Sequence, residues 1–219
     1  MVINSVIFDL DGVLVDSMMA WIEAYKETFK KFRLDFYHLE KQKIIVWASD
    51  KEIIDRFLPR VLENREEKIQ QIERHLFTTM ERFVPTSYIR QQEGSRELLE
   101  ALRKRNKKLA IVTNSDRRLV DKIVHRFDLQ KFFDVIVTKD DVRMTKPHPE
   151  PILQAAKKLG CKPNEILYIG DSEVDIVAGK AAGVMTAMFK PLTKESFEPQ
   201  TTPDYVLNKL EEILPLLEK

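Results

Sequence analysis

Two aspartates near the amino terminus, Asp9 and Asp11, directly follow a short apolar run that ends at Phe8. A run this short, rich in valine, isoleucine and phenylalanine, is typical of a strand that is buried on both faces of a parallel sheet. Open α/β sheets bind their ligands at the carboxyl ends of their strands, so we expect both carboxylates at such an edge. Gly12 would let the chain turn sharply beside them.

The spacing of Asp9 and Asp11 favours a divalent cation. Two carboxylates held close together repel each other, so a site that keeps both ionised needs positive charge beside them. The segment offers oxygen ligands and neither histidine nor cysteine, which favours Mg²⁺ over zinc or copper. A calcium loop of the EF-hand type is disfavoured, because the glycine stands at the wrong offset and no glutamate closes the loop. An acidic turn without a metal is the alternative for this segment alone.

The second candidate segment is Thr113-Asn114-Ser115, which follows the apolar run 109–112. A strand end that opens into a helix near Asp116 presents a hydroxyl group and free backbone N–H groups, and such groups bind phosphate. Taken alone, the same residues could do no more than cap the helix.

Lys146, Asp171 and Asp175 supply the remaining charged groups. Lys146 lies in a loop that three prolines stiffen, so its ammonium could serve as a fixed charge for a phosphoryl oxygen; the alternative is one more solvated lysine. Asp171 follows another apolar run. A helix that begins near Ser172 would put Asp175 in its first turn, at the same rim. Gly183 is predicted to end that helix.

Together these segments resemble a known family. The ordered set is Asp9-Leu10-Asp11-Gly12, Thr113-Asn114-Ser115, Lys146-Pro147, and Gly170-Asp171 followed by Asp175. This set is similar to the four motifs of the haloacid dehalogenase superfamily, the aspartate-dependent phosphohydrolases. No single motif is decisive, but four motifs in this order are highly specific. The acidic residue at position 11 favours hydrolysis or transfer of phosphate over dehalogenation.

The resemblance implies a role for each acidic residue. Asp9 would be the nucleophile that becomes an aspartyl-phosphate, and Asp11 would protonate the leaving oxygen and then activate water. Mg²⁺ would be bound by the Asp9 carboxylate, the backbone carbonyl of Asp11 and Asp171. Asp175 would complete the metal site by orienting the metal shell.

The resemblance also implies how phosphate would be bound. Thr113, the amide of Asn114 and Ser115 would bind the phosphoryl oxygens, and Lys146 would neutralise charge between the nucleophile and the phosphate. Simple electrostatics agrees with these roles, because a dianionic phosphate can approach a carboxylate only if a cation and a lysine cancel the repulsion.

The distribution of apolar runs predicts an α/β fold with two domains. Strands are expected at 5–8, 109–112, 134–138, 166–169, 185–188 and 204–207, alternating with helices as in a doubly wound parallel sheet. The span 16–87 shows only helical periodicity. We therefore expect a Rossmann-like core of the family type formed by 1–15 and 88–219. A small all-helical cap domain, 16–87, would be inserted after the first strand.

Composition limits the class of partner. The chain of 219 residues has 36 basic and 35 acidic residues and a net charge of +1, so neither nucleic acid nor an anionic membrane is predicted as a partner. Cys161 is the only cysteine, which excludes a disulfide within one chain. With no signal peptide or long apolar run recognisable, we expect a cytoplasmic location. The sequence makes no prediction of oligomeric state.

The sequence thus predicts a magnesium-dependent phosphatase that acts on a small phosphorylated metabolite, with phosphoglycolate, a sugar phosphate and pyrophosphate all open. One alternative is a phosphomutase with the same core, which Met18–Trp21 makes less favourable because related mutases place a histidine there. Another is a non-catalytic switch that would accept one phosphoryl group per chain and keep it. Trp47 in the cap could contact the leaving group or belong to the cap core.

Overall fold

A computed structural model describes residues 2–36, 50–190 and 200–218 of the chain. It divides into two compact units, one formed by Met1–Asp16 and Arg90–Lys219 and the other by Ser17–Ile89. The first boundary, after Asp16, lies one residue beyond the one expected after residue 15. The second, after Ile89, lies two residues beyond the one expected after residue 87. The sequence-predicted position Trp47 lies outside the described residues.

The larger unit contains a sheet of six parallel strands in the order β5-β4-β1-β6-β7-β8. The strands are β1 (Ser5–Phe8), β4 (Lys108–Val112), β5 (Val135–Val137), β6 (Ile166–Gly170), β7 (Met185–Phe189) and β8 (Tyr205–Leu207). All six lie where apolar runs predicted them. Phe8 pairs with Ile111 on one side and Ile169 on the other, so β1 is central and the ends of β4 and β6 flank its end.

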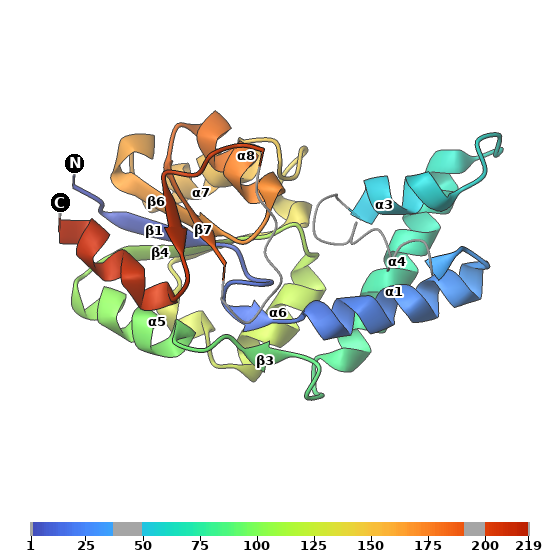
Figure 1. The fold of residues 1–219 in the computed structure, drawn as a ribbon, viewed down its shortest axis with the longest axis horizontal. Coiled ribbons are helices and arrows are strands. Elements are labelled where there is room, and N and C mark those ends of the chain that lie inside the picture. The colour runs from blue at the N-terminus through green and yellow to red at the C-terminus, as the bar shows by residue number, and fades with distance from the viewer. Residues whose placement is uncertain (1, 37–49, 191–199, 219) are drawn as a thin grey trace. The chain divides into compact units, whose positions relative to one another are not determined.

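Helices cover both faces of this sheet, as the doubly wound prediction requires. α7 (Glu150–Leu159) and α8 (Glu173–Ala182) contact each other and bury an apolar cluster against the strands. α5 (Ser95–Lys104) and α6 (Arg117–Arg126) lie in the connections from β1 to β4 and from β4 to β5, which proceed toward the β5 edge of the sheet. The connections that contain α7 and α8 proceed toward the β8 edge, so right-handed crossovers put α5 and α6 on the other face. In Figure 1, α5 lies beside the C-terminal 3-10 helix Leu210–Glu218, which it contacts.

Short elements complete the larger unit. A two-stranded antiparallel ladder pairs β2 (Val15–Asp16) with β3 (Arg90–Gln91), at the two points where the chain leaves and re-enters this unit. Three 3-10 turns precede β5, follow it and precede β6; they span Gln130–Phe132, Lys139–Asp141 and Pro163–Glu165.

The smaller unit, in its described part, is built from the helices α1 (Met18–Phe32), α3 (Asp50–Phe57) and α4 (Arg65–Phe83). α1 and α4 pack together, with Trp21 edge-on to Phe77 at 5.6 Å between ring centroids. Tyr25 is buried on α1 and its hydroxyl donates to the carboxylate of Asp50 at the start of α3. The apolar spacing that predicted these helices thus corresponds to their packed faces.

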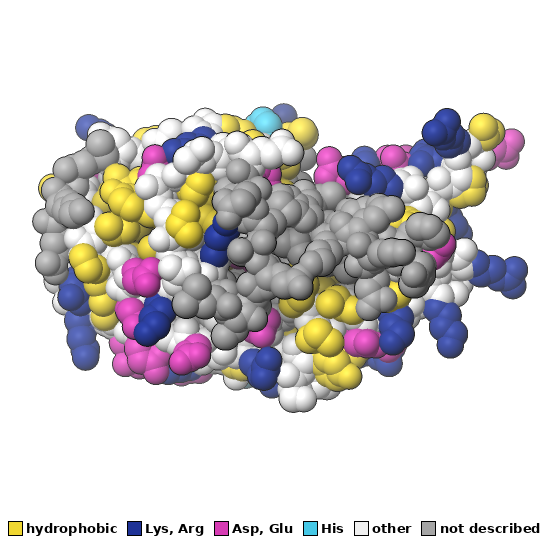
Figure 2. All heavy atoms as spheres, viewed as in Figure 1, with side chains coloured by type: hydrophobic (Ala, Val, Ile, Leu, Met, Phe, Trp, Pro, Cys, Tyr) yellow, Lys and Arg dark blue, Asp and Glu magenta, His cyan; other side chains and the backbone are white. Residues whose placement is uncertain are grey.

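Acidic and basic side chains are interspersed over the face drawn in Figure 2, in keeping with the near balance of charge in the sequence. Among the described residues, no helix combines the length and the apolar character needed to cross a membrane.

Candidate active site

The carboxyl ends of the central strands bring the predicted residues to one edge of the sheet. Asp9 follows β1, Thr113 follows β4, and Asp171 follows β6. Because these strands are parallel neighbours, their ends meet, which is the arrangement that the motifs predicted. Lys146 comes from the loop between β5 and α7 and reaches the same edge.

Lys146 is buried between two carboxylates. Its Nζ lies 3.0 Å from Oδ1 of Asp9 and 2.7 Å from Oδ1 of Asp175, and only 3% of the side chain is exposed. The ammonium also lies within hydrogen-bond distance of the hydroxyl of Tyr168, at 3.1 Å, and of the carbonyl oxygen of Val112, at 3.2 Å. An ammonium has three N–H donors, so these acceptors fully occupy it. Lys146 is therefore a fixed charge rather than a solvated surface lysine.

Asp175 joins β6, α8 and Lys146. Its Oδ1 accepts hydrogen bonds from Lys146 and from the hydroxyl of Tyr168 at 2.6 Å. Its Oδ2 accepts from the hydroxyl of Ser172 at 2.5 Å, from the backbone N–H of Ser172 at 3.1 Å and from that of Asp171 at 3.3 Å. Ser172 caps α8 and Asp175 completes the capping box, as the predicted helix start implied. Both carboxylate oxygens thus have protein donors.

The predicted phosphate-binding residues also bond to other parts of the site. The side chain of Asn114 donates to the carbonyl oxygen of Lys146 at 2.9 Å and accepts from its N–H at 3.0 Å. The hydroxyl of Ser115 donates to Oδ2 of Asp11 at 3.0 Å. The backbone N–H of Ser115 donates to the hydroxyl oxygen of Thr113 at 3.1 Å. Asn114 therefore holds the backbone of Lys146, and Ser115 orients Asp11.

Two glycines allow the acidic segments to approach closely. Gly12 has φ of 81°, and a Cβ there would lie 1.8 Å from Oδ2 of Asp171. A Cβ on Gly170 would lie 2.2 Å from the Cβ of Asp175. Any other residue at these positions would push the carboxylates out of place.

The acidic residues fit a hard divalent cation. Asp9, Asp171 and Asp175 each offer a carboxylate oxygen, and these oxygens lie within 4.8 Å of one another. An all-oxygen donor set of this kind suits Mg²⁺. Because Asp175 is already saturated by protein donors, Asp9 and Asp171 are the better placed to be direct ligands. The carboxylate of Asp11, by contrast, accepts from Ser115.

The charges of the site shift its pKa values in opposite directions. Burial raises the pKa of Asp9 well above its usual value, Lys146 opposes this, and the carboxylates of Asp175, Asp171 and Asp11 add to it. Burial alone would lower the pKa of Lys146, but Asp175 and Asp9 raise it above the ordinary lysine value. Lys146 thus stays charged. A cation bound beside Asp9 would favour the ionised form of the Asp9 carboxyl group.

Sequence reasoning did not identify Tyr168 or Ser172 as part of this site. Tyr168 stands within the apolar run of β6, where it resembles an ordinary core aromatic. Its hydroxyl was the available signal, because a phenol in the middle of a buried strand needs a hydrogen-bond partner. Ser172 was expected only at the start of a helix.

The family assignment follows from residues 6–189, which match the family model described as haloacid dehalogenase-like hydrolase. This chain belongs to the haloacid dehalogenase-like hydrolase family. The matched residues include Asp9, Asp11, Thr113, Lys146, Asp171 and Asp175. The predicted family, fold and hydrolase class are confirmed.

Relatives of similar length carry a phosphatase name. The pyrophosphatase PpaX of Halalkalibacterium halodurans is 34% identical over 218 residues, which cover 99% of this chain and 98% of that protein. The pyrophosphatase PpaX of Bacillus mycoides is 33% identical over 220 residues, which cover 100% and 99% of the two chains.

Solved structures agree with this assignment. A subfamily IA hydrolase of the same superfamily from Geobacter sulfurreducens is 28% identical, with a TM-score of 0.71, and the match covers 98% of this chain and all 100% of that one. CbbY from Rhodobacter sphaeroides, solved in complex with phosphate, is 24% identical and has a TM-score of 0.82, covering 99% and 100%. The second likeness shows the fold alone.

Proposed function

We propose that this hydrolase is a magnesium-dependent phosphatase that cleaves a small phosphorylated compound through an aspartyl-phosphate on Asp9. The observation that carries the proposal is the buried pair of Asp9 and Lys146, 3.0 Å apart, with Asp11 two residues further on. A carboxylate held beside a fixed cation can accept the approach of a phosphate dianion, which bare carboxylates would repel.

The first step assigns one task to each aspartate. A carboxylate oxygen of Asp9 attacks phosphorus while the bond from phosphorus to the leaving oxygen breaks, and Asp11 gives that oxygen a proton. The hydroxyl of Ser115, 3.0 Å from Oδ2 of Asp11, would keep the Asp11 carboxyl group in one orientation.

The second step reverses the role of Asp11. Now ionised, Asp11 takes a proton from water, whose oxygen attacks phosphorus and displaces the carboxylate of Asp9. Inorganic phosphate leaves, and both aspartates return to their starting states. Thr113, the amide of Asn114 and Ser115 would hold the phosphoryl oxygens in both steps, and Lys146 would neutralise charge between Asp9 and the phosphate, as the family resemblance implies.

Mg²⁺ would be bound by the carboxylates of Asp9 and Asp171 and by the backbone carbonyl of Asp11, with Asp175 orienting the site. When bound, it would neutralise charge on the phosphoryl group. Asp175 would act through the residues it contacts, because Lys146, Tyr168 and Ser172 already donate to both of its oxygens.

Pyrophosphate is the substrate to test first, because relatives 33% and 34% identical over nearly the whole chain are named pyrophosphatases. A phosphomutase with the same core is the second candidate; a structure described as a putative beta-phosphoglucomutase from Thermotoga maritima is 25% identical with a TM-score of 0.69. Steady release of phosphate from pyrophosphate supports the phosphatase. Interconversion of phosphohexoses without release supports the mutase, and uptake of one phosphoryl group that is then kept supports a switch.

The test of the mechanism compares Asp9→Asn with Asp11→Asn. Asp9→Asn should abolish reaction with every substrate, because an amide cannot form the covalent intermediate. Asp11→Asn should still react with an aryl phosphate, whose leaving group needs little protonation, but should lack the base for the second step. The peptide that contains Asp9 should then gain the mass of one phosphoryl group.

Two results would contradict the proposal. Turnover of aryl and alkyl phosphates by Asp11→Asn at the wild-type rate would remove Asp11 as acid and base. If the Asp9→Asn variant still forms a phosphorylated peptide, the nucleophile must be a residue other than Asp9.

A further inference from the structure

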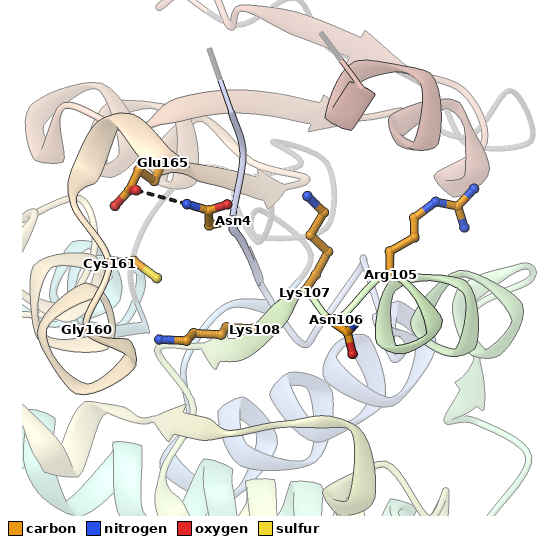
Figure 3. A pocket seen from close by; sticks show the side chains of 8 residues that line it. All are labelled: Asn4, Arg105, Asn106, Lys107, Lys108, Gly160, Cys161 and Glu165. Carbon is orange, nitrogen blue, oxygen red and sulfur yellow. Dashed lines mark hydrogen bonds between the residues drawn. The ribbon is translucent and has the colours of Figure 1, made fainter.

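A pocket of about 300 Å³ lies at the edge of the sheet opposite the aspartates. It opens at the amino ends of β1, β4 and β6, beside the carboxyl end of α7. Its lining includes Asn4, Arg105, Lys107, Lys108, Cys161 and Glu165 (Figure 3). The proposed phosphatase mechanism uses none of these residues.

The lining carries more positive than negative charge. Arg105, Lys107 and Lys108 are basic, and Glu165 is the acidic member of the lining. The carboxylate of Glu165 is already bonded, to the side chain of Asn4 at 2.9 Å and to the backbone N–H of Lys162 at 2.8 Å. Within the described part of the chain, neither Lys107 nor Lys108 belongs to an ion pair.

Both lysine ammonium groups are anchored on backbone carbonyls. Lys107 donates to the carbonyl oxygen of Ile3 at 2.5 Å, and Lys108 donates to that of Leu159 at 2.6 Å. Each ammonium keeps two further N–H donors. In Figure 3, Lys108 extends toward Gly160 and Cys161, whereas Lys107 extends on the side of Arg105. The two charges are therefore held in place at different walls of the pocket.

A tight turn after α5 presents these basic residues. Asn106 has φ of 54°, a left-handed conformation that asparagine tolerates better than most residues. Its N–H donates to the carbonyl oxygen of Arg103 at 3.0 Å, and the N–H of Lys107 donates to that of Leu102 at 3.1 Å. These residues belong to the run Arg103–Lys108, in which every residue except Asn106 is basic. α5 ends at Lys104, so most of the run lies beyond the helix.

We propose that this pocket binds a small oxyanion with two or more negative charges, of the phosphoryl or carboxylate class. Its volume is at the small end of the range found for ligand sites. The remaining N–H donors of the two lysine ammonium groups match the oxygens of such an anion, and Arg105, which also lines the pocket and donates to the carbonyl oxygen of Ala101 at 3.2 Å, adds positive charge. An anion between the walls would also offset the repulsion between these like charges.

Cys161 provides a reporter inside the pocket, because it is the only cysteine of the chain and is partly exposed. The rate at which iodoacetamide, a neutral reagent, alkylates Cys161 can be followed by mass spectrometry. The probes are methylenediphosphonate, which the enzyme cannot hydrolyse, and citrate, each in metal-free buffer with chloride at equal ionic strength as the control.

An anion in the pocket should slow alkylation by at least about fivefold at saturation, because it blocks access and cancels the charge that favours the thiolate. Burial raises the pKa of the Cys161 thiol and Lys108 opposes this rise. An anion that neutralises Lys108 would therefore raise this pKa further and slow alkylation, as would an anion that blocks access of the reagent to the thiol. Protection by methylenediphosphonate alone identifies a phosphoryl ligand. Protection by citrate alone identifies a polycarboxylate, and protection by both identifies a general oxyanion site.

Variants connect the protection to the pocket. Lys107→Gln with Lys108→Gln should lose the protection, whereas Lys104→Gln, on α5 outside the pocket, should keep it. The double variant could unfold because it loses the bonds from Lys107 to Ile3 and from Lys108 to Leu159. In that case Arg105→Gln, which leaves both bonds in place, is the test, and it should weaken the protection. Protection that chloride reproduces, that survives in both pocket variants, or that never occurs would overturn the proposal.

Discussion

The hydroxyl of Tyr168 donates a 2.6 Å hydrogen bond to Oδ1 of Asp175, across the turn from β6 into α8. Lys146 donates to the same carboxylate oxygen at 2.7 Å and lies 3.1 Å from the same hydroxyl. The three groups form a closed, buried triangle, and Lys146 also contacts Asp9. The position of the charge beside the proposed nucleophile therefore depends on Tyr168, a residue for which the mechanism proposes no contact with phosphate.

Tyr168→Phe should lower both stability and turnover. Loss of the hydroxyl removes a buried donor and should reduce the free energy of unfolding by about 1–3 kcal/mol. Because Lys146 loses a contact that orients it, kcat should fall by about ten- to a hundredfold, as for other groups that position active-site residues. Urea unfolding and phosphate release measure the two effects. The matched control is Tyr88→Phe, since Tyr88 is 42% exposed in the smaller unit.

A loss of stability in Tyr168→Phe with unchanged kcat would assign Tyr168 to packing alone. The control variant should change neither quantity.

Asp171→Asn and Asp175→Asn should separate metal binding from support of the site. Asp171→Asn should weaken Mg²⁺ binding most, with a small effect on unfolding. Asp175→Asn should weaken it less, by about ten- to a hundredfold. It should also cost about 3–5 kcal/mol of stability, because Lys146 would lose a buried ionic partner. Titration calorimetry with Mg²⁺ and urea unfolding distinguish the two.

Equal losses of Mg²⁺ affinity in the two variants would mean that both carboxylates bind the metal directly. Chelation of the metal should abolish turnover of the wild-type enzyme, and undiminished turnover in excess chelator would exclude the metal from the mechanism.

Asn114→Ala should act on the enzyme through Lys146. It removes two hydrogen bonds, at 2.9 and 3.0 Å, that hold the backbone of Lys146. We expect a lower kcat and a loss of about 1–3 kcal/mol in unfolding free energy. Gln130→Ala, which removes an exposed amide in the same unit, is the control and should leave kcat unchanged. A raised KM with unchanged kcat would instead favour a role in binding substrate alone.

Strand positions were readable from the sequence because strands buried on both faces require uninterrupted apolar runs. Val6, Leu109 and Leu167 belong to three such runs, and Leu109 and Leu167 each pair with Val6, one on either side of β1. Parallel order then brings the residues after each strand to one edge. Asp9 and Lys146 could therefore be placed together before any coordinates, even though 137 positions separate them in the numbering.

The bonds within the site were not readable in the same way. That the amide of Asn114 binds phosphate stays a prediction, whereas the bond from its side chain to the backbone of Lys146, 32 residues away, had no signal in the sequence. The hydroxyl of Ser115 bonds Asp11, 104 residues away. Such pairings depend on side-chain geometry that no local pattern carries. Tyr168 shows the converse, because burial in a strand concealed a polar role behind an apolar pattern.

Gly12→Ala and Gly183→Ala provide a matched test of whether Asp171 must stay where it is. Both glycines have positive φ, of 81° and 71°, so alanine at either position should cost about 1–2 kcal/mol of backbone strain. Around Gly183 a Cβ would meet nothing within 4 Å, whereas at Gly12 it would lie 1.8 Å from Oδ2 of Asp171. The two variants therefore share the strain and differ in the collision.

Gly183→Ala should consequently lose stability and keep both Mg²⁺ affinity and turnover per folded molecule. Gly12→Ala should lose both, because Asp171 can avoid the new methyl group only by leaving its position beside Asp9. Calorimetric titration with Mg²⁺ and phosphate release, each corrected for the folded fraction, measure the difference. If Gly12→Ala binds Mg²⁺ and turns over as Gly183→Ala does, the close approach of Gly12 to Asp171 serves the turn alone, and Asp171 is not the ligand that the metal requires.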